Sequence, residues 1–403
     1  MIKMAIFGYG TVGSGVAEVI RTNHEEIDRR VGDHLEVKYI LDLREFPGDP
    51  EESKVTHNVD DILNDPEIRI ITETMGGVEP AFTWSKEALK RGKSVCTSNK
   101  ELVAAHGPEL IALAKENNCN YMFEASVGGG IPIIRPMMTS LTAEKLINIT
   151  GILNGTTNYI LTKMDREGAD FDTVLKEAQE KGYAERNPEA DVEGYDACRK
   201  IAILSSLMYG KTVRYEDIQT EGITKITSAD FAYAHQLGMT IKLLAMSKCE
   251  GDSHFALVAP FMIPLSHPLA MVNDVFNAVF VQGNTLGDTM YYGRGAGKLP
   301  TASAVVGDVV DCARNLGRNL PVFWEDGRVE LASGGKAVRN FFVRLASSFD
   351  REEAMRVFSA DSVIDCDGLG DEYALITAPM SEDEFMTRVQ GCEVRSCIRL
   401  ESV

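Results

Sequence analysis

Acidic side chains crowd one short stretch of this sequence, just ahead of a lysine. The acids are Glu185, Glu189, Asp191, Glu193 and Asp196. A helix that continues into the apolar run IAILSSLMY is predicted to begin near Glu193, and Asp196 and Lys200, four residues apart, then share one face of it. Two interpretations are open. The acids form a solvated turn that suits the helix dipole, or they and Lys200 bind a small molecule with a positive charge and a polar group to be protonated.

A glycine motif near the amino end predicts a second kind of site. Residues 4–7 indicate a short apolar strand, and Gly8, Gly10 and Gly13 then form G-x-G-x-x-G at the start of a helix. Gly8 allows a tight turn, Gly10 lets the backbone approach a pyrophosphate, and Gly13 lets the helix pack on the strand. The amides at the helix start then face the phosphates, so the motif predicts dinucleotide binding.

The type of dinucleotide depends on two residues after the second predicted strand, LEVKYILD. That strand ends at Asp42, where an acid would bind the adenosine ribose of NAD. Arg44 lies two residues further on, where it would instead pair with the 2′-phosphate of NADP or serve as an ordinary loop cation. The choice between NAD and NADP therefore stays open.

Strand and helix patterns alternate through residues 68–123, which predicts an α/β fold with a Rossmann-type doubly wound parallel sheet. Ligands bind such sheets at the carboxyl ends of the strands. Asn99 and Lys100 follow the predicted strand KSVCT and are therefore candidate ligand contacts. The loop EASVGGGIPII follows the next strand, and its three glycines let the backbone come close to a ligand or to another segment.

The segment INITGILNGTTNYILTKM predicts a strand, a tight turn and a helix, with Thr156 or Thr157 as the N-cap. Further on, residues 212–295 contain several segments with period-2 alternation and few chemically reactive side chains. These segments predict a sheet that closes a second domain and pairs subunits.

The composition excludes several classes of function. The chain has 403 residues, a net charge of −19 and an apolar fraction of 44%. The length indicates two or three globular domains, and the charge argues against nucleic-acid binding. Eight cysteines without metal-ligand spacing suit a reducing cytoplasm. A first strand at residue 2 leaves no room for a signal peptide, and with no run of about 18 apolar residues no membrane span is expected.

Six segments occur in an order that resembles the homoserine dehydrogenase family: GYGTVGSG, SNKELVA, EASVGGGIPII, GILNGTTNYIL, GYAERNPEADVEGYDACRKIAIL and GRGAGKLPTASAVVGD. The resemblance covers residues 1 to about 318. It implies an oxidoreductase that interconverts L-aspartate 4-semialdehyde and L-homoserine with NAD or NADP, in the biosynthesis of threonine and methionine. It also implies an α+β catalytic and dimerisation domain beside the Rossmann-type domain, and a homodimer or homotetramer.

The resemblance assigns roles to individual residues. The catalytic residues would be Lys200 as the proton donor, Lys100 on the nicotinamide side, and Asp196. The substrate would be bound by Glu185, Asp196, Asp191, Tyr183 and Thr156. The cofactor would be bound by Gly8, Tyr9, Gly10, Thr11, Val12, Gly13, Asp42, Arg44, Asn99, Lys100 and Gly297. A monovalent cation, usually sodium, would be bound largely through backbone carbonyls by Glu124, Val127, Gly129 and Ile131.

The domain boundaries expected from these patterns are as follows. Residues 1–134 are expected to form the nucleotide-binding domain, and residues from about 294 to 318 are expected to complete it. Residues 135–293 are expected to form the catalytic and dimerisation domain. Residues 319–338 indicate a linker, and 339–403 predict the β-α-β-β-α-β order of a small C-terminal ferredoxin-like domain, which resembles the ACT domain.

The terminal domain is expected to fold independently, so a chain that ends near Ala337 is expected to keep its fold and activity. The glycine-containing turn usual after the first strand of an ACT domain is replaced by SSFDREEAM. Weak or absent inhibition by threonine is therefore expected, and the domain is assigned either to regulation or to dimerisation.

Two other functions remain open: a non-catalytic, dinucleotide-dependent amino-acid sensor and a different NAD(P)-dependent amino-acid reductase. The presence of Lys100, Glu185, Asp196 and Lys200 favours an enzyme, because a sensor does not need a proton donor. Chemistry through a cysteine thioester, as in semialdehyde dehydrogenases, is not indicated.

Overall fold

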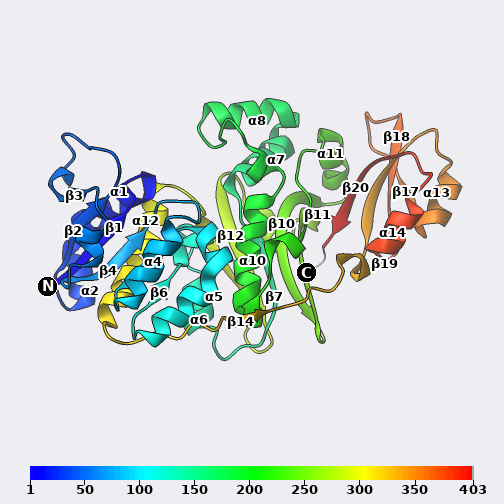
Figure 1. Ribbon diagram of the computed structural model, residues 1–403. Coiled ribbons are helices and arrows are strands. Elements are labelled where there is room, and N and C mark those ends of the chain that lie inside the picture. The colour runs from blue at the N-terminus through cyan, green and yellow to red at the C-terminus, as the bar shows by residue number, and fades with distance from the viewer. Residues whose placement is uncertain (402–403) are drawn as a thin grey trace. The chain divides into compact units, whose positions relative to one another are not determined.

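The computed structural model describes residues 1–401 (Figure 1). The chain divides into two compact units, each described here by itself. Unit 1 comprises Met1–Lys145, Ala202–Tyr215 and Gly293–Val329. Unit 2 comprises Leu146–Ile201, Glu216–Tyr292 and the described chain from Glu330 onward.

Unit 1 is built on a parallel sheet with the strand order β3-β2-β1-β4-β5-β6, the order of a Rossmann-type domain. The strands are β1 (Ile2–Phe7), β2 (Leu35–Leu41), β3 (Val55–Thr56), β4 (Ile68–Glu73), β5 (Ser94–Thr97) and β6 (Tyr121–Met122). Each pair of neighbouring strands in this sheet is parallel. The predicted doubly wound parallel sheet is therefore confirmed.

Helices of unit 1 bury the apolar residues of this sheet. They are α1 (Thr11–Thr22), α2 (His24–Val31), α3 (Asp60–Leu63), α4 (Ala81–Lys90), α5 (Lys100–Glu116), α6 (Ile134–Thr139) and α12 (Lys298–Arg314). Helix α12 comes from late in the chain, and its buried residues Val305 and Val309 share one hydrophobic core with Met4 and Ile6 of β1. The nucleotide-binding sheet is thus covered by a segment almost 300 residues away in sequence.

Unit 2 contains a long sheet with the order β13-β12-β7-β10-β11-β20-β16-β18-β17. The strands are β7 (Leu146–Ile152), β10 (Met239–Glu250), β11 (Ser253–Pro264), β12 (Phe276–Gly283), β13 (Gly287–Arg294), β16 (Phe341–Ala346), β17 (Val363–Ile364), β18 (Glu372–Ile376) and β20 (Val394–Leu400). The helices are α7 (Gly155–Glu167), α8 (Phe171–Glu180), α9 (Glu189–Val192), α11 (Ser228–Gln236), α13 (Arg351–Phe358) and α14 (Glu382–Arg388), with α10 (Tyr195–Tyr209) beginning in this unit. The strands predicted between residues 212 and 295 are present.

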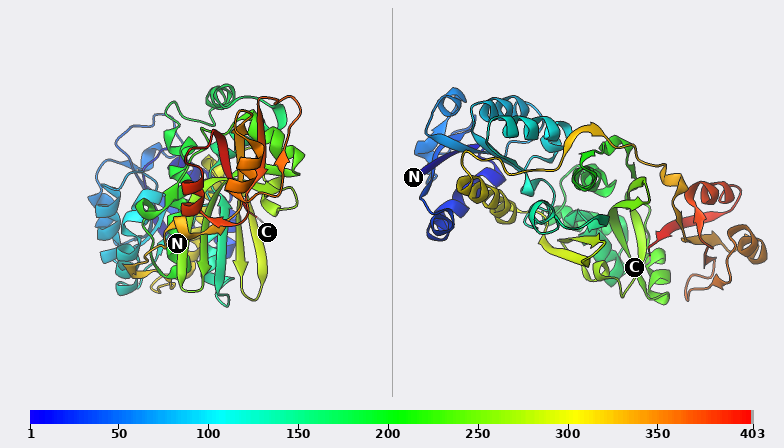
Figure 2. Two further views of the ribbon diagram at one scale, coloured as in Figure 1. Left: turned by 90° about the vertical axis from the view of Figure 1, so that its right-hand side faces the viewer. Right: turned by 90° about the horizontal axis from the view of Figure 1, so that it is seen from below.

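The terminal domain, residues 339–401, has the predicted β-α-β-β-α-β order in β16, α13, β17, β18, α14 and β20. It has its own apolar core, which includes Phe341, Phe358 and Tyr373. Its last strand, β20, pairs in parallel with β11, so this domain continues the sheet of unit 2 (Figure 1, Figure 2).

Buried ion pairs reinforce this attachment. Arg344 of β16 lies 2.8 Å from the fully buried Asp230 of α11, and Arg399 of β20 lies 2.6 Å from Glu221. The predicted linker is itself bonded: the Trp324 indole donates to the Thr212 hydroxyl at 3.1 Å, and residues 325–328 form β14 beside β8 (Lys211–Thr212). A chain ending near Ala337 would lose the contacts of Arg344 and Arg399 with the rest of unit 2.

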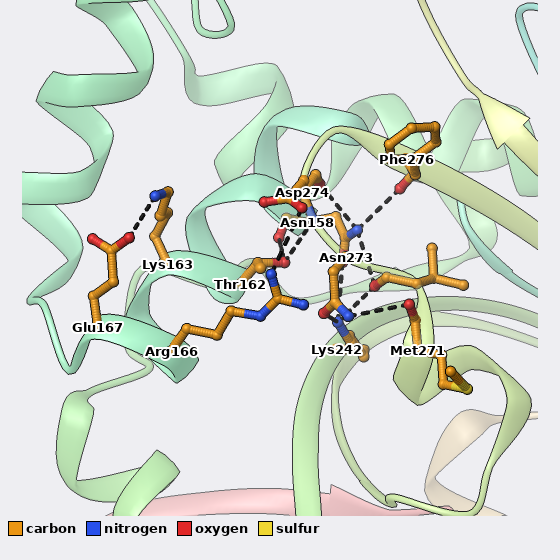
Figure 3. A network of polar contacts seen from close by, with 11 residues as sticks. Asn158, Thr162, Lys163, Arg166, Glu167, Lys242, Met271, Asn273, Asp274 and Phe276 are labelled. Carbon is orange, nitrogen blue, oxygen red and sulfur yellow. Dashed lines mark hydrogen bonds and ion pairs between the residues drawn. The ribbon is translucent and has the colours of Figure 1, made fainter.

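A buried lysine holds three segments of unit 2 together (Figure 3). Lys242 of β10 is 1% exposed, and its ammonium donates to the Val272 carbonyl at 2.7 Å and to Asn273 Oδ1 at 3.0 Å. Asn158 of α7 donates to three backbone carbonyls of residues 272–276. Because these hydrogen bonds satisfy the ammonium, the charge is tolerated in the core.

We expect the stability contribution of Lys242 to depend on pH. Burial lowers its pKa to about 8, whereas an unfolded lysine titrates near 10.4. Below pH 8 both states carry the proton and the burial penalty is fully present. Between these values the folded state binds fewer protons, so this group makes stability rise with pH, by at most about 1.4 kcal/mol per pH unit.

Urea unfolding of the protein and of Lys242→Met tests this at about pH 7.5 and about pH 9.5. The free energy of unfolding of the unmodified protein relative to Lys242→Met should increase between the two. A difference that stays constant would contradict the lowered pKa.

Candidate active site

The acidic stretch and Lys200 meet at the carboxyl end of β7 in unit 2. The ammonium of Lys200, on α10, donates to Asp196 Oδ2 at 2.6 Å and to the Leu153 carbonyl at 2.8 Å. The side chains of Lys200 and Asp196 are only 13% and 10% exposed. The prediction that these two residues share one helical face is confirmed, and the contact leaves the ammonium fixed at a strand end.

Asn154 is the residue that organises this cluster. Its Oδ1 accepts from the Thr157 amide at 2.9 Å and caps α7, while its Nδ2 donates to Asp191 Oδ1 at 2.7 Å and to Asp196 Oδ2 at 2.9 Å. The predicted caps Thr156 and Thr157 were therefore wrong. Asn is as good an N-cap as Ser or Thr, and this preference is the signal that would have found Asn154.

Thr156 has a different role, since its hydroxyl donates to the Tyr183 carbonyl at 2.7 Å. The Tyr183 side chain is 46% exposed and packs edge-on against Tyr159, with 5.0 Å between ring centroids. This contact anchors the loop before α9 to the first turn of α7.

The five acids divide into two groups. Asp191 and Asp196 converge on Asn154, and burial raises the pKa of Asp191. Glu185 and Glu189 are exposed, and Glu193 accepts from the Thr224 hydroxyl at 3.2 Å. Two acids of the stretch thus belong to a cluster beside Lys200, and the others lie at its surface. Binding of a small molecule by this cluster stays a prediction.

The glycine turn of unit 1 has room for a phosphate. Gly8 has a φ of 85°, and a Cβ on Gly13 would lie 1.9 Å from the Gly8 carbonyl oxygen, so neither position accepts a side chain without a shift. By contrast, a Cβ on Gly10 would meet nothing within 4 Å apart from atoms of Gly10 and its immediate chain neighbours. Thr11 and Val12 open α1 directly after this space. The residues present therefore fit a dinucleotide pyrophosphate at the helix start.

Asp42 and Arg44, which gave conflicting indications of the cofactor, form one ion pair. Arg44 donates from Nε to Asp42 Oδ1 at 2.9 Å and from Nη2 to Oδ2 at 3.0 Å. The Tyr9 amide donates to Oδ2 at 2.7 Å as well. These contacts, chiefly those of Arg44, lower the pKa of Asp42 to about 2. The acid therefore positions the guanidinium beside the glycine turn.

Asn99 and Lys100 lie where they were predicted, just beyond the end of β5. Asn99 caps α5 by accepting from the Leu102 amide at 3.1 Å, and Lys100 is the first residue of that helix. Sequence reasoning missed Glu73 at the end of β4. Its fully buried carboxylate accepts from the Thr97 hydroxyl at 2.6 Å and the Met75 amide at 2.8 Å, and burial raises its pKa.

The expected cation loop has its only acidic side chain already engaged. The Glu124 carboxylate accepts from the amides of residues 133, 134 and 135 at 2.6 to 2.9 Å. Among residues 1–401, no group of three or more His, Cys, Asp or Glu is placed to hold a metal ion. Backbone carbonyls of Val127, Gly129 and Ile131 remain as oxygen donors, and Gly129 adopts a φ of 57° where the loop approaches Gly295.

Gly297 lies at the N-cap of α12 with a φ of 117°, in the segment that returns to unit 1.

In residues 1–401, no helix is long and apolar enough to cross a membrane.

Profiles of known families match most of the chain. The profile described as the NAD-binding domain of homoserine dehydrogenase matches residues 8–124, and the profile described as homoserine dehydrogenase matches residues 132–310. A homoserine dehydrogenase of Bacillus subtilis is 42% identical over 318 residues, 78% of this chain and 73% of that protein. One of Mycobacterium tuberculosis is 45% identical over 353 residues, 85% of this chain and 80% of that protein.

Solved structures extend the similarity to the whole chain. A homoserine dehydrogenase of Thiobacillus denitrificans has a TM-score of 0.91 and 36% identity, and covers 100% of this chain and 98% of its own. A hyperthermophilic archaeal homoserine dehydrogenase in complex with NADPH has a TM-score of 0.67 and 30% identity, and covers 79% of this chain and 99% of its own.

Proposed function

This chain belongs to the homoserine dehydrogenase family, and on that premise we propose that it interconverts L-aspartate 4-semialdehyde and L-homoserine with Lys200 as the proton donor. It is an NAD(P)-dependent oxidoreductase of that family. The observation that supports the assignment of Lys200 is its largely buried ammonium, which donates to Asp196 at 2.6 Å and to the Leu153 carbonyl at 2.8 Å.

The contacts of Lys200 within residues 1–401 use two of the three N–H donors of its ammonium. The third can donate to a substrate oxygen. In the reductive direction negative charge grows on the aldehyde oxygen, which Lys200 stabilises and then protonates to form the hydroxyl. In the oxidative direction the neutral amine takes that proton back. When bound, the nicotinamide supplies or accepts the hydride.

The substrate also carries an ammonium and a carboxylate, and acids near Lys200 suit the ammonium. Asp191 and Asp196 are fixed by Asn154, so they are preorganised, whereas Glu185 is exposed on the loop before α9. We assign substrate contacts to these acids together with Tyr183 and Thr156, which the same loop brings to the first turn of α7.

The nucleotide-binding residues proposed in unit 1 are Gly8 to Gly13, Asp42, Arg44, Asn99, Lys100 and Gly297. Lys100 is further proposed to act on the nicotinamide side, since it opens α5 at the carboxyl end of a parallel strand. A sodium ion is proposed at the backbone carbonyls of Glu124, Val127, Gly129 and Ile131, where oxygen donors suit a hard cation. Replacing sodium by choline in the assay tests that part.

The expected assembly and location are also part of the proposal. Strand β13 ends the unit 2 sheet and exposes Met290 and Tyr292, which supports a homodimer or homotetramer formed through the domain at 135–293. All eight cysteines are free thiols, which supports the cytoplasm as the location. Residues 339–401 are proposed as an ACT-like regulatory or dimerisation domain.

The decisive assay follows the oxidation of NADH and NADPH in the presence of L-aspartate 4-semialdehyde. We expect turnover with both nucleotides. A protein that binds nucleotide but oxidises neither would contradict an enzyme and favour the amino-acid sensor.

Arg44→Ala is expected to weaken NADPH more than NADH, by at least about tenfold, because only the 2′-phosphate needs the guanidinium. Its bidentate ion pair with Asp42 holds Arg44 at the end of β2, where the ribose of a bound nucleotide is expected. The ratio of kcat/KM for the two nucleotides measures this. Equal losses for both would remove Arg44 from phosphate recognition.

Glu185→Gln is expected to raise the KM for homoserine more than it lowers kcat, because the change removes a charge from the substrate loop but leaves Lys200 in place. Glu189→Gln, an equally exposed acid on α9, is the matched control. If the two variants have the same KM, Glu185 is a surface residue without a substrate contact.

A further inference from the structure

A cavity of about 230 Å³ lies in unit 2, between the β10–β11 hairpin and the first residues of the terminal domain. Its lining includes Lys248 and Glu250 of β10, Leu257 of β11, Arg339 and Glu401. The volume is well above the ~30 Å³ share of one water molecule. It is below the roughly 300–1,000 Å³ of pockets for drug-sized ligands, so it suits a molecule of a few carbon atoms.

Arg339 is the residue in this lining whose hydrogen bonds are incomplete. Its Nε and Nη1 atoms are buried, and no residue among 1–401 accepts a hydrogen bond from either. The guanidinium lies 5.4 Å from the ring centroid of Phe261. Burial lowers the pKa of Arg339, yet an arginine does not lose its proton in a protein, so the charge stays. Buried N–H donors without an acceptor are costly, which indicates that an acceptor binds there.

The other buried arginines of the terminal domain do have partners. Arg344 donates to both carboxylate oxygens of Glu372 and to Asp230, and Arg399 donates to Glu382 and Glu221. The fold therefore supplies carboxylates wherever it buries these two guanidinium groups. At Arg339 it supplies an aromatic ring and a cavity instead.

The remaining charges of the lining do not neutralise Arg339. Lys248 and Glu250 pair with each other at 2.8 Å. Glu401 attracts Arg339 without reaching it, and burial raises the pKa of the Glu401 carboxyl. The walls between these groups include the apolar side chains of Met246, Leu257 and Leu400. The lining thus offers the guanidinium of Arg339, apolar walls and two carboxyl groups, of which that of Glu250 is paired with Lys248.

We infer that this cavity binds a small carboxylate, which accepts hydrogen bonds from the guanidinium of Arg339 and places its carbon chain against the apolar walls. A guanidinium matches a carboxylate in both geometry and charge. The ligand is either a simple carboxylic acid or an amino acid whose ammonium faces Glu401. The site lies apart from Lys200, but β10 pairs with β7, whose end supplies the Leu153 carbonyl to that lysine.

Calorimetric titration of the full-length protein with valine and with isovalerate tests the inference, because the two have the same carbon skeleton with and without the ammonium. We expect at least one to bind and to raise Tm. Arg339→Met should weaken that binding at least about tenfold, the factor for losing a charge-assisted hydrogen bond. The same variant should raise Tm without ligand, because it removes two buried donors that have no acceptor.

Arg344→Met is the matched control. It should lower Tm, because it strands Asp230 and Glu372, and it should leave the affinity for the carboxylate unchanged in the folded protein. Glu401→Gln separates the two ligand classes: valine binding weakened alone indicates an amino acid, and unchanged binding of both indicates a simple acid.

Three results would overturn the inference. The first is no binding of either acid up to about 10 mM. The second is an affinity that Arg339→Met leaves unchanged, which would place the ligand elsewhere, for example near Lys200. The third is equal affinity for inorganic phosphate, which would indicate recognition of any anion.

Discussion

Lys200→Met is expected to lower kcat by at least about a hundredfold, because general-acid catalysis contributes roughly 10²–10⁴-fold to a step of this kind. The ammonium is held by Asp196 Oδ2 at 2.6 Å and by the Leu153 carbonyl at 2.8 Å, so its position is set by two segments of the fold. Methionine keeps an unbranched apolar stem and removes the donor. The loss would therefore report proton transfer and not packing.

Stopped-flow or steady-state measurement of NADPH oxidation at saturating L-aspartate 4-semialdehyde gives kcat directly. Nucleotide affinity, measured by fluorescence, should be unchanged, because the glycine turn lies in unit 1. Lys163→Met is the matched control, since Lys163 forms an ion pair with Glu167 one turn away on α7, outside the cluster. Turnover of Lys200→Met close to that of Lys163→Met would remove Lys200 from the role of proton donor.

A chain that ends at Ala337 is expected to be severely destabilised, contrary to what its sequence indicated. Truncation removes β20 from the edge of β11 and the Arg344 guanidinium from Asp230, which is 0% exposed. Leaving one buried charge without its partner costs about 3–5 kcal/mol, a large part of the roughly 5–15 kcal/mol that stabilises a domain. We therefore expect Tm to fall by more than about 10 °C, or the shortened chain to be insoluble.

Differential scanning calorimetry of the two chains measures the effect. Arg395→Ala is a useful control, because it breaks the exposed ion pair with Asp371 at 2.7 Å and a contact with Glu372 at 3.1 Å. Arg344 keeps Glu372 paired in this variant, so Tm should change little. A shortened chain with unchanged Tm and full activity would show that the terminal domain adds no stability to unit 2.

Titration of threonine against the full-length enzyme remains the test of regulation by this domain, and weak or absent inhibition is expected.

Features that depend on neighbouring residues could be predicted from the sequence. The strand, glycine turn and helix around Gly8 follow from backbone sterics within ten residues, and the contact of Asp196 with Lys200 follows from the helical repeat. The β-α-β-β-α-β order of the terminal domain is likewise a local pattern. Each of these features follows from residues that are close together in the sequence, and each is present in the structure.

Features that depend on distant segments were decided only by the tertiary structure. Asn154 donates to Asp191 and Asp196 but to none of the other three acids, because the end of β7 lies beside α9 and the start of α10. Asp196 follows Asn154 by more than 40 residues in the sequence. The pairing of β20 with β11 joins residues that lie about 140 positions apart. Arg339 and Arg344 cannot be told apart by sequence pattern. In the structure Arg344 forms an ion pair with Asp230, whereas Arg339 lines a cavity. The physical reason is common to all three: hydrogen bonds and charges find their partners in space, and one-dimensional periodicity does not encode which elements will meet.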